Sequence, residues 1–192
     1  MKGQGIQMSI DNNLSNEILS IKNLTVDFGG VRAVNDVSFS LKTGEMVALI
    51  GPNGAGKTTV FNLITNAIKP TSGQILLNGK SILGISPDKI CRLGISRTFQ
   101  NIRLFPQMTA YENVELGLHS TPQYSLAEAF VRTPRARQSE INTRKKALEL
   151  LEIVNLKDHA HARASSMPYG LQRRLEIARA MATSPQLLLL DE

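Results

Sequence analysis

The chain has 192 residues, 42% hydrophobic and 20% charged, with a formal net charge of +6, which is typical of a globular protein of one domain or slightly more. Its apolar runs are short, such as 46–50 and 187–190, and none approaches the roughly 18 residues of a spanning helix. No apolar stretch follows Lys2 to form a secretory signal, and the single Cys91 excludes an internal disulfide, so we expect a cytoplasmic protein.

Residues 1–17 are polar and rich in Asn and Ser, and we expect them to form a mobile tail before a domain that covers 18–192. Apolar and polar residues then alternate in two segments, Ile18–Phe28 and Val34–Leu41. This period of two predicts strands with one face toward a core, and the Gly-Gly pair at 29–30 predicts the turn between them. The sequence therefore predicts a small antiparallel sheet.

The segment Glu45–Ile50 is apolar after its glutamate without alternating, which predicts a strand buried on both faces of an α/β sheet. A glycine-rich loop follows at once. Residues 58–68 then carry apolar side chains at helical spacing, and Pro70 ends the predicted helix. The order of strand, glycine loop and helix is the setting in which such a loop binds phosphate.

The remaining chain predicts short strands and several helices. The strands are expected at 74–77, 95–98 and 187–190, the last of them fully buried, and the helices at 87–93, 109–118, 139–154 and 171–183. We expect an α/β fold of the P-loop NTPase type, with a parallel core sheet around the glycine loop, an antiparallel subdomain and a helical insertion over about 109–170.

Much of the positive charge lies between residues 132 and 146. The basic residues there are Arg132, Arg135, Arg137, Arg144, Lys145 and Lys146. No aromatic side chain of the kind that stacks on bases lies among them, so a solvated helical face is favoured over a surface for nucleic acid or an anionic membrane. We expect no nucleic acid partner.

The glycine loop carries the main functional prediction. It consists of Gly51, Pro52, Asn53, Gly54, Ala55, Gly56, Lys57 and Thr58, with Thr59 next in the helix. Its glycines let the backbone N–H groups approach phosphate oxygens, and the positive end of the following helix adds attraction. Lys57 supplies a point charge for the β- and γ-phosphates, and the Thr58 hydroxyl suits Mg²⁺. The alternative is a glycine-rich turn without a ligand.

Two acids, Asp191 and Glu192, follow the leucines at 187–190. At the end of a buried strand, Asp191 is suited to hold Mg²⁺ through water, and Glu192 is suited to polarise an attacking water as a general base. A leucine run before two acids is weak evidence alone. Together with the glycine loop it predicts a nucleoside triphosphatase.

Features between these motifs resemble the ATP-binding subunits of ABC transporters. The pair Phe99-Gln100 resembles the Q-loop of that family, whose glutamine contacts Mg²⁺ and the attacking water and senses the membrane subunits. Phe28 occupies the place of the aromatic residue that stacks on adenine, with core packing as the alternative. The segment 167–180 is similar to the family's signature segment and helix.

The signature segment departs from the usual Leu-Ser-Gly-Gly-Gln form. Pro168 stands at the serine, Tyr169 at the first glycine and Leu171 at the glutamine, so the hydroxyl donor is lost. Gly170 and the neighbouring N–H groups at the start of the helix still suit an anion. The resemblance implies that Tyr169 and Gly170 face the ATP of a second subunit.

The variant signature, with the segments 27–34 and 97–105, resembles the subgroup that serves branched-chain amino acid importers. The resemblance covers about Ile18 to Glu192. It implies an ATPase that dimerises around two ATP molecules, uses Mg²⁺, binds membrane permease subunits and lies at the inner face of the membrane. The family's D-loop, switch histidine and last strands are absent from this sequence, so we expect a C-terminally incomplete domain that hydrolyses ATP poorly by itself.

Two alternatives remain from the sequence. The positive charge permits an ABC ATPase that acts on ribosomes or DNA, although such proteins usually carry two nucleotide-binding domains in one chain. A GTPase or small-molecule kinase with the same loop is less well supported. A GTPase requires Asn-Lys-x-Asp, and the similar segment 155–158 here reads Asn-Leu-Lys-Asp, in the wrong order.

Overall fold

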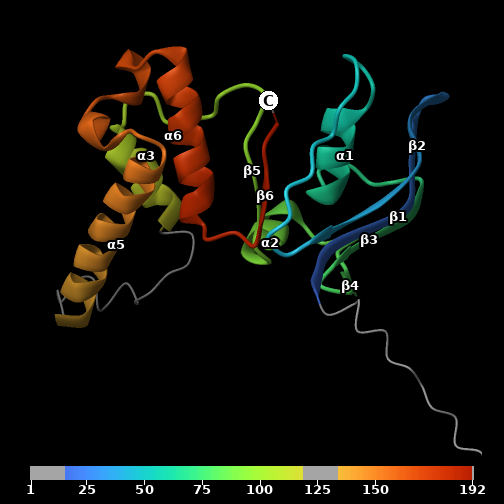
Figure 1. Ribbon diagram of the computed structural model, residues 1–192, viewed down its shortest axis with the longest axis horizontal. Helices are drawn as coiled ribbons and strands as arrows, with labels where there is room; N and C mark the ends of the chain where they lie inside the picture. Colours follow the sequence, from blue (N-terminus) through green and yellow to red (C-terminus); the bar gives the residue numbers. More distant parts are fainter. Residues whose placement is uncertain (1–15, 119–133, 192) are drawn as a thin grey trace, which may run out of the picture. The chain divides into compact units, whose positions relative to one another are not determined.

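The computed structural model describes residues 16–118 and 134–191, which belong to two compact units, one up to Ser86 and one from Pro87 onward (Figure 1). Most of the expected N-terminal tail lies outside the described residues, and Glu17 already belongs to the first strand. Among the helices of these two ranges, none combines the length and the hydrophobicity needed to cross a bilayer.

The first unit is built on an antiparallel sheet of four strands in the order β2-β1-β3-β4. The strands are β1 (Glu17–Phe28), β2 (Val31–Lys42), β3 (Ser72–Leu77) and β4 (Lys80–Ser81). The predicted hairpin is confirmed, because β1 pairs with β2 across Gly29 and Gly30, whose φ angles of 52° and 92° favour glycine. Asn78 and Gly79, also at positive φ, form the turn between β3 and β4.

Helix α1 (Lys57–Ile64) packs its buried residues Val60, Leu63 and Ile64 into the core of this unit. It ends four residues earlier than the helix predicted to 68. Asn66 lies in the left-handed region, with φ of 52°, and its side-chain amide donates to the carbonyl oxygens of Ile82 and Ile85. These tertiary hydrogen bonds hold the chain out of the helix before Pro70 is reached.

The prediction of a fully buried strand at Glu45–Ile50 is wrong for this structure. The segment pairs with none of the described strands, and Met46 and Ile50 are 96% and 94% exposed. An extended segment becomes a strand only when a neighbour completes its hydrogen bonds. The apolar composition of residues 45–50 therefore predicted burial, but the described residues do not cover this segment.

The second unit combines helices with a two-stranded parallel sheet. Its elements are α2 (Pro87–Arg92), β5 (Ile95–Arg97), α3 (Ala110–Leu118), α5 (Pro134–Ile153), α6 (Tyr169–Ala182) and β6 (Leu187–Leu189), with short 3₁₀ turns at Lys157–His159 and Ala164–Ser166. Gly94, two residues after the end of α2, has a φ of 91°. Helix α5 begins five residues before the predicted start, and its Ile141 is 56% exposed.

The parallel pairing predicted for the core sheet is present between β5 and β6, with Ile95, Ser96 and Arg97 beside Leu187, Leu188 and Leu189. Among the described residues these are the only parallel strands, and the segment before the glycine loop is not one of them. The predicted burial of the last strand is only partly right, since Leu190 is 50% exposed. The α/β class is confirmed.

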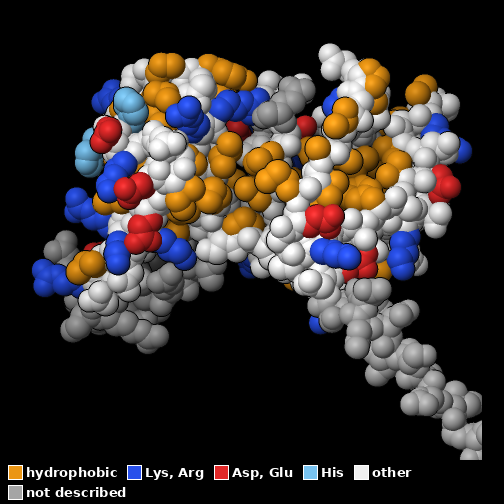
Figure 2. Space-filling view, viewed as in Figure 1, with side chains coloured by type: hydrophobic (Ala, Val, Ile, Leu, Met, Phe, Trp, Pro, Cys, Tyr) orange, Lys and Arg blue, Asp and Glu red, His pale blue; other side chains and the backbone are white. Residues whose placement is uncertain are grey.

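Helices α3, α5 and α6 form the main core of the second unit around Val114, Leu151 and Leu175, all fully buried. Helices α3 and α6 pack so closely at Gly117 that a Cβ added there would lie 2.7 Å from Ala182 Cβ. The exposed side of α5 carries Arg137, Arg144, Lys145 and Lys146. Figure 2 shows Lys and Arg mixed with Asp and Glu over this helix, as on a solvated face.

Candidate functional site

The glycine loop is an exposed turn between the extended segment 45–50 and α1 in the first unit. Gly54 and Gly56 have φ angles of 83° and 85°, a region that side-chain-bearing residues adopt at a cost. At Gly56 a Cβ would also lie 2.5 Å from the Ala33 carbonyl oxygen. Glycine is therefore required at 56 both by conformation and by contact with β2.

Lys57 folds back over this loop. Its Nζ donates to the carbonyl oxygens of Gly51 and Pro52, at 2.7 and 2.9 Å. Gly56 caps α1 without a side-chain hydrogen bond, so the positive helix end faces the loop without a competing acidic side chain. The loop thus has one cation, a helix N-terminus and glycines that admit close approach of an anion, which is the arrangement expected for phosphate.

Phe28 lies at the end of β1, opposite Val31, and is 49% exposed. The same end of the hairpin carries Ala33, which touches Gly56. The aromatic ring is therefore open to a ligand at the end of the sheet that supports the loop. This exposure argues against the alternative that Phe28 packs in the core.

In the second unit, β5 and β6 end at the same edge of their sheet, and the residues that follow them are the expected Q-loop and the acids. Asp191 is buried, and its Oδ2 lies 2.6 Å from Nη2 of Arg97, whose side chain is only 7% exposed. The Asp191 backbone N–H donates to Thr98 Oγ1 at 3.1 Å. Glu192, the expected general base, lies outside the described residues.

Helix α6 holds the loop 99–103, which contains Gln100. Glu176 is 2% exposed, and its Oε1 accepts from the backbone N–H groups of Phe99 and Arg103 at 3.3 and 3.4 Å. Its Oε2 accepts from Arg173 Nη1 at 3.0 Å. Arg173 in turn donates to the carbonyl oxygens of Phe99, at 2.5 Å, and of Gln100.

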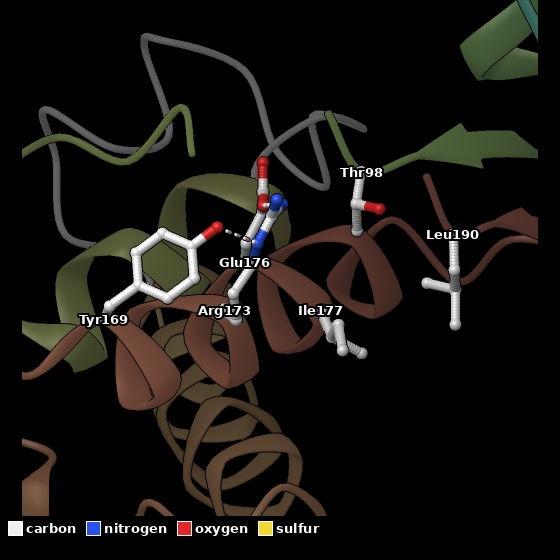
Figure 3. A pocket seen from close by; sticks show the side chains of 6 residues that line it. All are labelled: Thr98, Tyr169, Arg173, Glu176, Ile177 and Leu190. Atoms are coloured by element: carbon white, nitrogen blue, oxygen red, sulfur yellow. Dashed lines mark hydrogen bonds and ion pairs between the residues drawn. The ribbon is translucent and has the colours of Figure 1, made fainter. Parts of the chain in front are cut away.

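A cavity of about 470 Å³ opens beside these residues. Figure 3 shows Tyr169, Arg173, Glu176 and Ile177 entering it from α6, with Thr98 and Leu190 from the ends of the strands. Arg173 Nε donates to Tyr169 Oη at 3.1 Å. Burial alone would lower the pKa of Arg173, but its hydrogen bonds to Tyr169 and Glu176 outweigh burial and raise that pKa, so the guanidinium stays charged.

At the signature segment, Pro168 precedes the first residue of α6, and its φ of −55° suits a helix start. Tyr169 is 65% exposed, and a Cβ at Gly170 would meet nothing within 4 Å. Both residues are thus accessible, which a contact with a ligand or partner would require.

The predicted residues fall into two groups. Phe28 and the loop 51–59 belong to the first unit, and Gln100, Tyr169, Gly170 and Asp191 belong to the second. No cluster of three His, Cys, Asp or Glu side chains that could hold a metal occurs within 16–118 and 134–191. Thr58 in the first unit, and Gln100 and Asp191 in the second, each carry an oxygen of the hard type that Mg²⁺ prefers.

Sequence analysis missed three contributors, Arg97, Arg173 and Glu176. A signal for the last two was present, since Arg and Glu three residues apart on one helix lie on the same face. A glutamate between the apolar Leu175 and Ile177 also required a buried partner. Nothing in the local sequence pointed to Arg97, whose partner Asp191 is 94 residues away.

Comparison with known proteins gives one family. Residues 34–192 match the family model described as ABC transporter. The chain is 45% identical to the high-affinity branched-chain amino acid transport ATP-binding protein LivG of Escherichia coli, over 93% of this chain and 70% of that protein. It is 46% identical to the corresponding protein BraF of Pseudomonas aeruginosa, with the same coverage.

A solved structure with the same fold is the dimeric post-hydrolysis state of an ATP-binding cassette bound to ADP and Pi. The match has a TM-score of 0.74 and 31% identity, and covers 91% of this chain and 74% of that one.

Proposed function

Since the chain belongs to the ABC transporter family of ATP-binding proteins, we propose that it binds ATP with Mg²⁺ and couples ATP hydrolysis to the import of branched-chain amino acids. The geometry of the glycine loop carries this proposal. An exposed loop that requires glycine at 56, is covered by Lys57 and leads into the N-terminus of α1 is suited to a triphosphate.

In this function, residues 51–59 bind the phosphates, and Phe28 stacks on the adenine. Thr58 and Gln100 would bind Mg²⁺ directly and Asp191 would hold it through water, and the ion would neutralise charge on the phosphates. Glu192 polarises the attacking water, which Gln100 also contacts. Arg97 pairs with Asp191 at 2.6 Å within the second unit and compensates the charge of that buried carboxylate.

The partners are a membrane permease and a second ATP-binding subunit. The loop 99–105 offers Phe105, which is 50% exposed and lies near the Arg179 guanidinium at 5.8 Å, as a contact for the permease. Leu104, the residue before it, packs partly against the helical core. Tyr169 and Gly170 face the nucleotide of the second subunit, and the protein lies at the inner face of the membrane.

Likeness to LivG and BraF supports branched-chain amino acids as the cargo, and it favours transport over an action on ribosomes or DNA. The test is uptake of labelled leucine, isoleucine and valine in the protein's own host after a chromosomal Lys57→Ala change. We expect uptake of these three to fall while uptake of lysine is unchanged. Unchanged uptake with defective translation or DNA repair would favour the alternative.

A further inference from the structure

The contacts between α6 and the loop 99–103 carry an inference about how this loop is positioned. The side chains of Arg173 and Glu176 on α6 make five hydrogen bonds here. Four join them to the backbone of the loop, and one joins them to each other. Two of them use the carbonyl oxygens of Phe99 and Gln100, and two use the N–H groups of Phe99 and Arg103. The loop is thus held at both of its ends by one ion pair.

The chemistry of the pair is specific. Glu176 receives three donors, two backbone N–H groups and Arg173, and it is 2% exposed. A carboxylate can accept on both of its oxygens, whereas an amide would replace one acceptor with a donor that faces other donors. Arg173 likewise uses separate nitrogens for the loop and for Tyr169, which a lysine ammonium at one point cannot reproduce.

The pair also reaches the signature segment. Arg173 Nε donates to the hydroxyl of Tyr169, the first residue of α6 (Figure 3). A continuous set of polar contacts therefore runs from Tyr169 through Arg173 to the carbonyl oxygen of Gln100.

We propose that Arg173 and Glu176 are positioning residues for ATP hydrolysis, which fix the loop around Gln100 and connect it to Tyr169. This inference rests on the proposed function. Phe28 and the loop 51–59, which are proposed to bind the base and the phosphates, belong to the other unit, so we expect changes at the pair to lower turnover more than nucleotide affinity.

The test uses the full-length protein with its permease in proteoliposomes, with Glu176→Gln and Arg173→Met as variants. Matched controls remove an exposed charge of the same kind from α5, Glu149→Gln and Arg137→Met. We expect kcat to fall about 10- to 100-fold in both variants, since a displaced catalytic loop costs this much, while KM for ATP stays within about threefold. Arg173→Lys should fall between Arg173→Met and the unchanged protein.

Hydrogen exchange gives a second readout that does not depend on turnover. The amides of Phe99 and Arg103 should exchange faster in Glu176→Gln, and those of α1 should not. Unchanged kcat with unchanged exchange would overturn the proposal. A lower melting temperature, with a normal kcat at temperatures below it, would assign the pair a structural role only. That result would also overturn the proposal. An unchanged protein that binds no ATP in calorimetry would instead refute the proposed function itself.

Discussion

Two positions of the glycine loop, 54 and 56, require glycine for different reasons. Gly54 and Gly56 have nearly the same φ, but only Gly56 lies against another part of the chain, the Ala33 carbonyl oxygen. A larger residue would therefore strain the backbone at both positions, but it would meet a close neighbour only at position 56.

This difference predicts the stability of two alanine variants. Gly56→Ala should destabilise the protein by about 1–3 kcal/mol more than Gly54→Ala, because it adds overpacking to the same strain. Urea unfolding of both variants without nucleotide measures this. Equal losses would show that the contact between the loop and β2 is not as close as described.

Phe28 presents a half-exposed ring at the end of β1. If the ring stacks on the base, Phe28→Ala should weaken ATP and GTP alike by about 1–3 kcal/mol, since stacking uses the face of a base and not its edge. Calorimetry with both nucleotides measures the loss, and Val31→Ala, on the opposite strand, is the control. Unchanged affinity with a lower melting temperature would make Phe28 a packing residue.

At the scale of elements, α3 begins with a reciprocal cap. The Thr109 backbone N–H donates to Glu112 Oε2 at 2.7 Å, and the Glu112 N–H donates to Thr109 Oγ1 at 3.2 Å. The Thr109 hydroxyl also donates to Glu112 Oε2 at 2.9 Å, and the hydrogen bonds from the Thr109 backbone and hydroxyl to this carboxylate lower the pKa of Glu112 below its ordinary value of 4.5.

The sign of this shift fixes its dependence on pH. A carboxylate whose pKa is lowered by folding stabilises the folded protein fully when the pH is above its ordinary pKa. This contribution is lost as the pH falls through the pKa that the group has in the folded protein. Glu112→Gln should therefore be less stable than the unchanged protein at pH 7 and approach it below pH 4.5. Urea midpoints at both pH values test this, and an equal difference at both would contradict the cap.

Elements with local signals could be predicted from sequence, and those that depend on distant partners could not. The β1–β2 hairpin followed from alternation and two glycines, and the glycine loop from its motif. The segment 45–50 was expected to be a strand because its composition suits burial, but a strand also needs a neighbour. Gln100 was identified by resemblance, whereas its supports on α6 lie more than 70 residues away.

At the scale of the whole molecule, the proposed permease contact predicts a cross-link. A photoreactive cross-linker attached at Phe105→Cys, in a Cys91→Ser background, should trap the permease in membranes, because Phe105 is half exposed on the loop that leads from Gln100. The same chemistry at Arg137, on α5, is the control and should trap less. Cross-links to ribosomal proteins in place of the permease would favour the alternative function.

The central claim is that this chain binds ATP through the loop 51–58. Lys57 is its one cation, so Lys57→Ala should lower the affinity for Mg²⁺-ATP by about 10- to 100-fold, the range for loss of hydrogen bonds to a charged group. Its melting temperature should hardly change, since within 16–118 and 134–191 the Lys57 ammonium bonds to carbonyl oxygens of its own loop alone. Lys69→Ala, at an exposed lysine of the same unit, should bind normally. Titration calorimetry of the three proteins decides the question, and equal affinity in all of them would contradict the account.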